Sequence, residues 1–418
     1  VDKEQWYKAP ISSMDDLHGD LRGIIEHLDH VQNLGIDVLY MTPVFKSNSS
    51  HKYDTIDYYQ IDPSFGTTED LRELVQEAHK RGMKIVMDAV FNHTGREFFA
   101  FEDIMEKGEK SKYLDWYYIE KFPLKSERGE IPNYKCFGYY GGMPKLNLKN
   151  PEVEKFITDV ACYWIKECNI DGWRMDVGDE ISHYFWKNFR RAVKAVKKDI
   201  LIIGEIWHYA GDFLEGDEWD TVMNYPFYLN LIDLLADEKI SVSQFVQNLG
   251  YLKGRLHKKC YPLMWNLIDS HDTARFLHLC KDNKKKQHLA AAFQLLLPGM
   301  PMIYYGDEYA MPGANDPDCR RGMYWDEEYQ DKEMYEWYKR LIQVRKSHAC
   351  IVEGELAGIV TEDEEGTVVL IRKNGEETIA MIFNCSSSAK KFNEYTQKYN
   401  LLTENTFDGN VEGFDAAV

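Results

Sequence analysis

Runs of apolar residues alternate with amphipathic segments along most of the chain, and this alternation predicts its strands and helices. Seven short runs are almost continuously apolar, which is typical of strands buried on both faces of a parallel sheet. These runs are residues 36–45, 84–91, 170–177, 200–207, 221–225, 263–270 and 301–305. Other segments place apolar residues three or four positions apart, which predicts helices. These segments are residues 20–34, 68–81, 151–168, 181–198, 227–256 (two helices), 284–297 and 331–346.

Alternation of strands and helices over about 300 residues is typical of a parallel sheet covered by helices. Seven strands are one fewer than the eight of a (β/α)8 TIM barrel. Residues 1–19 show no convincing pattern for an eighth strand. We therefore expect an α/β fold of the (β/α)8 TIM-barrel class over residues 1–346, with a first strand that is missing or weakly patterned.

Two segments interrupt this alternation. Residues 94–150 are rich in aromatic residues and are too long for an ordinary loop between a strand and a helix, so we expect a small subdomain inserted in the barrel. From about residue 347 the apolar period changes to two. Two strands and the turn between them are expected at 367–372, 378–383 and Asn374-Gly375. We expect residues 347–418 to form an antiparallel, β-sandwich-like domain that ends without an obvious closing strand.

Composition restricts the partners and the location that we expect. The 418 residues carry a formal net charge of −19 with scattered basic residues, which argues against nucleic acid and anionic membrane surfaces as partners. No apolar run approaches the roughly 20 residues that cross a bilayer, and no signal peptide is visible. The eight cysteines form neither a CxxC pair nor a zinc spacing, which predicts free thiols and a cytoplasmic location. The chain begins with Val1 rather than Met, so a processed N-terminus stays open.

Charged and polar residues recur where the predicted strands end. In a parallel barrel the carboxyl ends of all strands open on one face, where catalytic groups gather. The residues at these ends are Asp88, Asn92, His93, Arg174, Asp176, Glu205, Asp269, His271, Asp272, Asp307 and Glu308. Taken alone, Arg174 and Asp176 fit a buried structural ion pair equally well. Five strands that end in this way are not expected from packing alone, and no ligand spacing indicates a metal.

Carboxylates in different surroundings are what glycoside hydrolysis requires. One carboxylate must be ionised to attack the anomeric carbon, and the other must hold a proton for the leaving oxygen. Arg174 shares a strand face with Asp176 and favours its ionised form, which suits a nucleophile. Glu205 is followed by Ile206 and Trp207, apolar neighbours that favour a protonated carboxyl, which suits the acid.

Further side chains suit a sugar substrate. Asp272, beside His271, can hold sugar hydroxyls and stabilise an oxocarbenium-like charge. The aromatic rings of Tyr53, Trp207 and Tyr225 suit the flat faces of pyranose rings, although each could equally be a packing residue.

Four motifs at these positions resemble the signature regions of glycoside hydrolase family 13, the α-amylase family. They are DAVFNH (88–93), GWRMDV (172–177), GEIW (204–207) and SHD (270–272), in the family's order. The resemblance covers about residues 15–350 and implies a retaining double displacement. It implies Asp176 as nucleophile, Glu205 as acid and base, and Asp272 as transition-state stabiliser. The ligands that it implies for the cleaved glucose are Tyr53 (which would stack on the ring), His93, Arg174 and His271.

Finer motifs are similar to the branch of cyclomaltodextrinases, neopullulanases and maltogenic amylases. They are MPKLN (143–147), GEIWH (204–208) and NDPDCRR (315–321). By that likeness Asp316 and Arg320 would contact the sugar on the non-reducing side, and the α-glucan substrate would be a cyclodextrin, pullulan or a short maltodextrin, with glucosyl transfer open. The branch carries an N-terminal β-domain that mediates dimerisation, so we expect this chain to derive from a longer enzyme and leave a homodimer open. The likeness implies no required cofactor and leaves a structural calcium open.

One segment departs from this branch. After Asp176 the branch typically reads Val-Ala-Asn-Glu, whereas this chain reads Val177-Gly178-Asp179-Glu180, which leaves acceptor choice open. Two alternatives also stay open: an α-1,6-glucosidase or glucan-isomerising member of the family, and an inactive carbohydrate-binding relative. The MPKLN motif argues against the first alternative, and the three acidic residues argue against the second.

Overall fold

The computed structural model describes residues 3–14, 17–125 and 131–418 of the chain. Its internal contacts divide the chain into two compact units, which are described separately. The N-terminal unit comprises His18–Ile206 and Asp212–Val222. The C-terminal unit comprises Val1–Leu17, Trp207–Gly211 and Met223–Val418.

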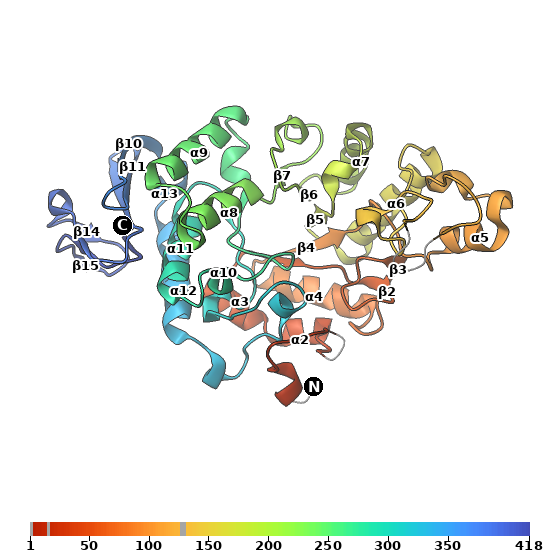
Figure 1. The fold of residues 1–418 in the computed structure, drawn as a ribbon, viewed down its shortest axis with the longest axis horizontal. Helices are drawn as coiled ribbons and strands as arrows, with labels where there is room; N and C mark the ends of the chain where they lie inside the picture. Colours follow the sequence, from red (N-terminus) through yellow and green to blue (C-terminus); the bar gives the residue numbers. More distant parts are fainter. Residues whose placement is uncertain (1–2, 15–16, 126–130) are drawn as a thin grey trace. The chain divides into compact units, whose positions relative to one another are not determined.

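A five-stranded parallel sheet, in the order β1-β4-β5-β6-β7, is the centre of the N-terminal unit (Figure 1). The strands are β1 Val38–Met41, β4 Lys84–Ala89, β5 Gly172–Met175, β6 Leu201–Gly204 and β7 Thr221–Val222. All five lie inside predicted strands but are shorter. The register places Asp88 beside Arg174, and Arg174 beside Ile203, so the carboxyl ends of three strands are level. Strands β4 and β5 are buried almost throughout because helices cover the sheet.

The helices of this unit begin at side-chain caps. They are α2 Leu21–Glu26, α3 Leu28–Leu34, α4 Thr68–Lys80, α5 Phe99–Lys107, α6 Pro151–Cys168 and α7 His183–Val196. Thr67 and Asp70 form a reciprocal capping box at α4, and the Ser182 side chain accepts from Phe185 N–H at α7. The single helix predicted over 20–34 is wrong. His27 leaves helical geometry between α2 and α3, and its Nδ1 donates to the Gly23 carbonyl.

The described residues before Val38 contain helices and no strand. A hairpin of β2 Phe45–Ser47 and β3 Thr55–Ile61 follows β1, and the sequence did not predict it. In the segment 94–150, α5 is followed by short turns and isolated bridges, and the ring of Phe101 packs on those of Tyr117 and Tyr134. The start of α5 packs on α6, since the rings of Phe99 and Phe156 lie 5.9 Å apart between centroids.

The C-terminal unit contains two further predicted parallel strands, β8 Trp265–Asn266 and β9 Met300–Pro301. Its helices are α1 Lys3–Trp6, α8 Tyr225–Leu231, α9 Val242–Arg255, α10 Phe276–Leu279, α11 Lys284–Leu296, α12 Lys332–Ser347 and α13 Cys350–Glu353. A short π-helix at Ile232–Ala236 continues α8. None of the helices within the described residues is both long enough and apolar enough to cross a bilayer.

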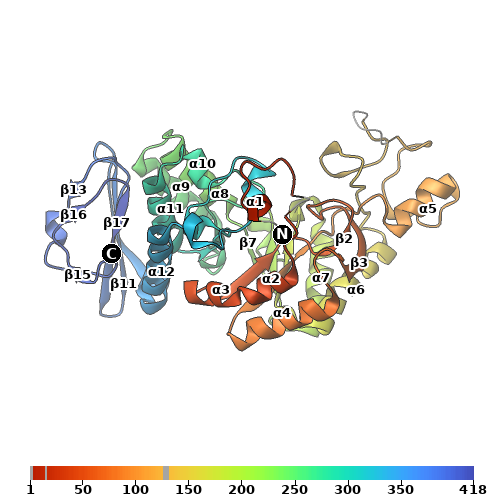
Figure 2. The ribbon, with the colours of Figure 1, turned by 90° about the horizontal axis from the view of Figure 1, so that it is seen from below.

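An antiparallel sheet in the order β10-β11-β12-β17 lies near the end of the chain. Its strands are β10 Glu355–Glu362, β11 Thr367–Asn374, β12 Glu377–Asn384 and β17 Asp415–Ala417. Smaller ladders pair β13 Lys390–Lys391 with β16 Asn410–Val411, and β14 Tyr399–Asn400 with β15 Asn405–Thr406. Figure 2 shows these strands gathered beside α12. The expectation that no strand closes this sheet is wrong, because β17 pairs with β12 but is too short to show an alternating pattern.

Replacing Phe383 tests the packing of α11 against this sheet. Phe383 and Phe293 are both fully buried and stack with their ring centroids 4.2 Å apart. Phe383→Ala should lower the free energy of unfolding by about 3–5 kcal/mol, because it leaves a cavity in a close-packed core. Urea unfolding followed by circular dichroism measures this change. The exposed Tyr399→Ala is the control and should change stability by less than about 0.5 kcal/mol. A loss below about 1 kcal/mol for Phe383→Ala would contradict the packing.

Candidate active site

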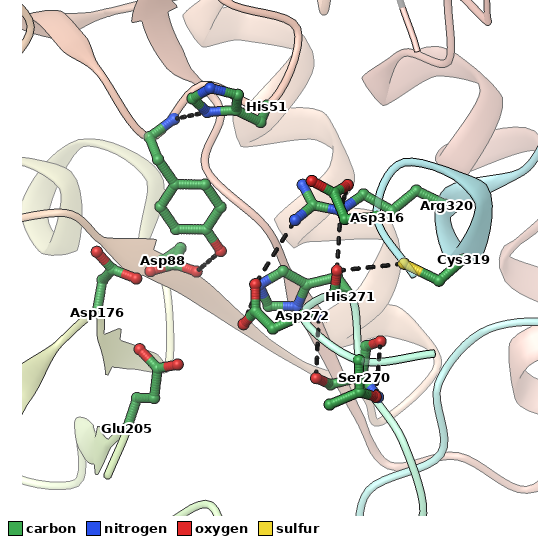
Figure 3. A network of polar contacts seen from close by, with 12 residues as sticks. His51, Asp88, Asp176, Glu205, Ser270, His271, Asp272, Asp316, Cys319 and Arg320 are labelled. Atoms are coloured by element: carbon green, nitrogen blue, oxygen red, sulfur yellow. Dashed lines mark hydrogen bonds and ion pairs between the residues drawn. The ribbon is translucent and has the colours of Figure 1, made fainter. Parts of the chain in front are cut away.

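Arg174, near the end of β5, binds three carboxylates in the N-terminal unit. Its side chain is completely buried, and Nη1 lies 2.9 Å from Asp176 Oδ1 and 3.0 Å from Asp88 Oδ2. Its Nη2 lies 3.0 Å from Glu205 Oε1. Asp88 comes from β4 and Glu205 follows β6, so three neighbouring strands supply the carboxylates (Figure 3). A buried guanidinium is costly to desolvate, and these three partners compensate for that cost.

The charge of Arg174 is fixed by these neighbours. Burial opposes the charged form, but the Asp88 and Glu205 carboxylates hold the pKa of Arg174 well above its usual value. The expectation that Glu205 lies in purely apolar surroundings is wrong, because Glu205 shares this cation with Asp176. Glu205 Oε2 also accepts a hydrogen bond from Val177 N–H at 2.9 Å. The distinction between the two carboxylates therefore does not come from Arg174.

Asp88 also orients two tyrosines. Its Oδ2 accepts hydrogen bonds from Tyr40 Oη at 2.6 Å and from Tyr53 Oη at 3.0 Å. The backbone N–H of Tyr53 donates to His51 Nδ1 at 3.0 Å (Figure 3). Asp88 was predicted only as a strand-end residue without a role, and no sequence pattern indicated Tyr40. Only the register of the sheet brings Tyr40 to this carboxylate.

His93 lies beside Tyr53 and is buried. Its Nε2 donates to the Tyr53 carbonyl oxygen at 3.0 Å, and its ring stacks on Phe137 with centroids 5.2 Å apart. Burial lowers the pKa of His93 to about 4, so the imidazole is neutral at neutral pH. The sequence-predicted residues Tyr53, His93, Arg174, Asp176 and Glu205 thus occupy one connected region of the N-terminal unit.

Lys145, from the MPKLN motif, forms a second polar group in this unit. Its Nζ lies 2.7 Å from Glu180 Oε2 and donates to Asn92 Oδ1 at 2.6 Å. Asn92 Nδ2 also donates to Glu180 Oε2 at 3.2 Å. The motif had suggested a branch of the family, but its lysine had received no role. These contacts connect the inserted segment to the residues that follow Asp176.

The C-terminal unit brings together four other sequence-predicted residues (Figure 3). His271 Nε2 lies 3.0 Å from Asp272 Oδ2, and Arg320 Nη2 lies 3.5 Å from Asp272 Oδ1. Arg320 Nε lies 2.9 Å from Asp316 Oδ1 and donates to the His271 carbonyl at 2.9 Å. The Asp272 carboxylate is 28% exposed, so solvent reaches it. Arg320 therefore ties Asp272 to Asp316.

Trp207 also belongs to the C-terminal unit. Its ring stacks almost parallel on Tyr225, with centroids 3.9 Å apart, and 41% of Trp207 is exposed. A tryptophan supported on one face and exposed elsewhere can present a flat apolar surface to a ligand.

Two strand-end carboxylates support this unit rather than facing solvent. Asp269 and Asp307 are fully buried, and Arg275 Nη1 lies 3.2 Å from Asp307 Oδ1. Burial and the neighbouring Asp269 raise the pKa of Asp307 well above its usual value, so the pair favours a shared proton. Arg275 Nε donates to the Cys319 carbonyl at 3.0 Å, next to Arg320. The sequence could not separate these supporting acids from reactive ones.

Within residues 3–14, 17–125 and 131–418, no group of three or more His, Cys, Asp or Glu side chains is arranged to hold a metal ion. All eight cysteines are free thiols in the structure.

Comparison with known proteins identifies the family. The model for the α-amylase catalytic domain matches residues 8–354. The chain belongs to the α-amylase family. This membership confirms the resemblance found in the sequence. It also confirms the predicted fold class, a (β/α)8 TIM barrel with a C-terminal antiparallel β-domain.

Three relatives show how much of a longer or similar-length protein this chain matches. A cyclomaltodextrinase of Geobacillus thermopakistaniensis is 47% identical over 89% of this chain and 63% of its own length. An intracellular maltogenic amylase of Bacillus subtilis is 43% identical over 88% of this chain and 62% of its own length. The chain thus spans less than two thirds of these relatives. A solved cyclic α-maltosyl-(1→6)-maltose hydrolase from Arthrobacter globiformis is 34% identical over 99% of this chain and 92% of its own, with a TM-score of 0.90.

Replacing Arg174 tests how much its ion pairs with three carboxylates stabilise the fold. Arg174→Met should lower the free energy of unfolding by about 3–5 kcal/mol at pH 7, because it leaves buried carboxylates without their partner. The loss should shrink at pH 5, where these carboxylates take up protons more readily once the cation is gone. Urea unfolding at the two pH values measures this difference. An equal loss at both would contradict the electrostatic account.

His93 gives a second, pH-dependent prediction. Its pKa is about 4 in the folded protein against an ordinary value of 6.5. Its contribution to stability is therefore present above pH 6.5 and lost as pH falls to about 4, because the unfolded chain takes up the proton first. The loss should be about 3 kcal/mol. The free energy of unfolding should fall less between pH 7 and pH 4.5 in His93→Gln than in the wild type. The control is His18→Gln at an exposed histidine, which should fall as much as the wild type. An equal fall in His93→Gln and the wild type would refute the assignment.

Proposed function

We propose that the protein is a retaining glycoside hydrolase that cleaves α-1,4-glucosidic bonds of cyclodextrins, pullulan or short maltodextrins. The observation that carries this proposal is the pair of carboxylates, Asp176 and Glu205, held by Arg174 at the ends of neighbouring strands. The relatives named cyclomaltodextrinase and maltogenic amylase support the substrate class.

The proposed reaction proceeds by double displacement. Asp176 attacks the anomeric carbon while Glu205 gives its proton to the departing glycosidic oxygen, which leaves a covalent glycosyl ester on Asp176. Glu205 then takes a proton from a water molecule, whose oxygen attacks the anomeric carbon and releases Asp176. Two inversions retain the configuration. Arg174, whose charge is fixed, stabilises Asp176 as an anion before attack and after release.

The other roles follow from the family resemblance. In the N-terminal unit, we assign Tyr53 to stacking on the sugar ring and neutral His93 to hydrogen bonding with sugar hydroxyls. In the C-terminal unit, Asp272 is assigned to stabilisation of the oxocarbenium-like charge. The remaining substrate ligands that we propose are Trp207, His271, Asp316 and Arg320. For the residues of the C-terminal unit, these roles rest on the resemblance alone.

The proposed chemistry uses only side chains and water, so we assign it no required cofactor. A structural calcium and a homodimer are both compatible with it. We also propose a cytoplasmic enzyme, for which the free cysteines and the relative named intracellular maltogenic amylase are the supporting observations.

A second candidate is cleavage in a glucan that contains α-1,6 linkages, by an α-1,6-glucosidase or a glucan-isomerising activity. It is favoured by the match over nearly the full length of both chains to the cyclic α-maltosyl-(1→6)-maltose hydrolase. The products from pullulan separate the two candidates. Panose indicates cleavage of α-1,4 bonds, whereas maltotriose indicates cleavage of α-1,6 bonds.

Activity on β-cyclodextrin tests the proposal directly. The wild type should release reducing sugar, and Asp176→Asn should lower kcat by at least about 10³-fold because the nucleophile is lost. Asp159→Asn, an exposed aspartate on α6, is the matched control and should keep wild-type activity. An inactive wild type on every α-glucan tested would favour the carbohydrate-binding alternative and end the enzyme proposal.

A further inference from the structure

The backbone directly after Asp176 is in an unusual conformation. Val177 has φ 47° and ψ 44°, the left-handed region, which is sterically unfavourable for a β-branched residue. Such residues persist only where surrounding contacts enforce them, and they concentrate at functional sites. This turn leads the chain from the strand into the 3-10 turn Gly178–Glu180.

Gly178 is enclosed by two indoles. A Cβ atom at this position would lie 2.7 Å from Trp219 Cζ2, closer than real contacts allow. Trp186 Nε1 donates to the Gly178 carbonyl at 2.9 Å, which holds the peptide from the other direction. The position therefore accepts no side chain unless Trp219 or the backbone moves.

Trp219 also contacts the strand that leads to Glu205. A Cβ atom at Gly204, the last residue of β6, would lie 2.2 Å from Trp219 Cε3. The ring is 1% exposed and stacks in parallel on Phe213 with centroids 4.1 Å apart, so it has little freedom to shift. One indole thus fills the space between the residue before Glu205 and the second residue after Asp176.

We propose that Trp219 is a positioning residue that sets the spacing between the Asp176 and Glu205 segments. Gly178 and Gly204 leave room for its ring, and the result is the hydrogen bond from Val177 N–H to Glu205 Oε2. The proposal rests on the proposed function, in which the separation of the two carboxyl groups determines whether the double displacement can proceed. It also gives a physical reason for Gly178, where the related branch typically carries alanine.

Gly178→Ala tests this assignment, because its methyl group must displace Trp219 or the turn. We expect kcat on β-cyclodextrin to fall about 10–100-fold, with KM changed less than about threefold. The loss should fall on kcat rather than KM, because the substitution changes the spacing of the two carboxylates and leaves the proposed sugar-binding residues in place. A purely structural role would lower the amount of folded enzyme but would not change kcat per folded active site.

A second substitution provides a rescue. Phenylalanine lacks the indole edge that faces residue 178, so Gly178→Ala combined with Trp219→Phe should recover at least about tenfold of the lost kcat. Gly250→Ala is the matched control, because a Cβ atom there would meet nothing within 4 Å. If Gly178→Ala does not fold, Trp219→Phe alone should lower kcat while KM changes less than about threefold.

The outcomes separate this inference from the proposed function. An inactive wild type would overturn the function and, with it, this inference. An active wild type whose kcat is unchanged by Gly178→Ala would overturn the inference alone. A folded Gly178→Ala variant that Trp219→Phe does not rescue would also overturn it.

Discussion

The N-terminal unit depends on one buried cation. Arg174 is inaccessible to solvent and pairs with Asp88, Asp176 and Glu205, which come from three neighbouring strands. Each charge would be costly to bury alone, so the four groups constrain one another. The parallel register that places β4, β5 and β6 side by side is what makes this arrangement possible. The same arrangement holds the two carboxylates that we propose as nucleophile and acid.

Aromatic packing adds to the ion pairs in positioning the Asp176 and Glu205 carboxylates. The carboxylates must be held within a fraction of an ångström for chemistry, and ion pairs on flexible side chains do not provide that precision alone. Trp219, stacked on Phe213, fills the space beside both segments, and two glycines admit its ring. Asp88 also orients Tyr40 and Tyr53 by accepting hydrogen bonds from their hydroxyl groups. Rigid aromatic packing and buried ion pairs therefore both position the residues of the candidate active site.

Sequence patterns located the seven parallel strands because each lies within or overlaps a nearly continuous apolar run, although β1 and β9 are only partly buried. They did not reveal β17, whose three residues are too short to show a period. The predicted surroundings of Glu205 were wrong for a different reason: its contact with Arg174 depends on strand register, and the neighbours in sequence do not report it. The pairing of Trp219 with Gly178 was hidden in the same way. Gly178 stood out only as a departure from the related branch, and nothing in the sequence connects it to Trp219. Motifs identify which residue types are present, but tertiary contacts decide their environment.

In the proposed double displacement, Asp176 becomes covalently attached to the sugar. Incubation of a Glu205→Gln variant with an activated maltosyl fluoride should trap this ester, because the leaving fluoride needs no acid but the second step lacks its base. Mass spectrometry of the digested protein then locates the label. One maltosyl unit is expected on the peptide that contains Asp176. A label on another residue, or turnover without any label and with inversion of the anomeric configuration, would contradict this mechanism.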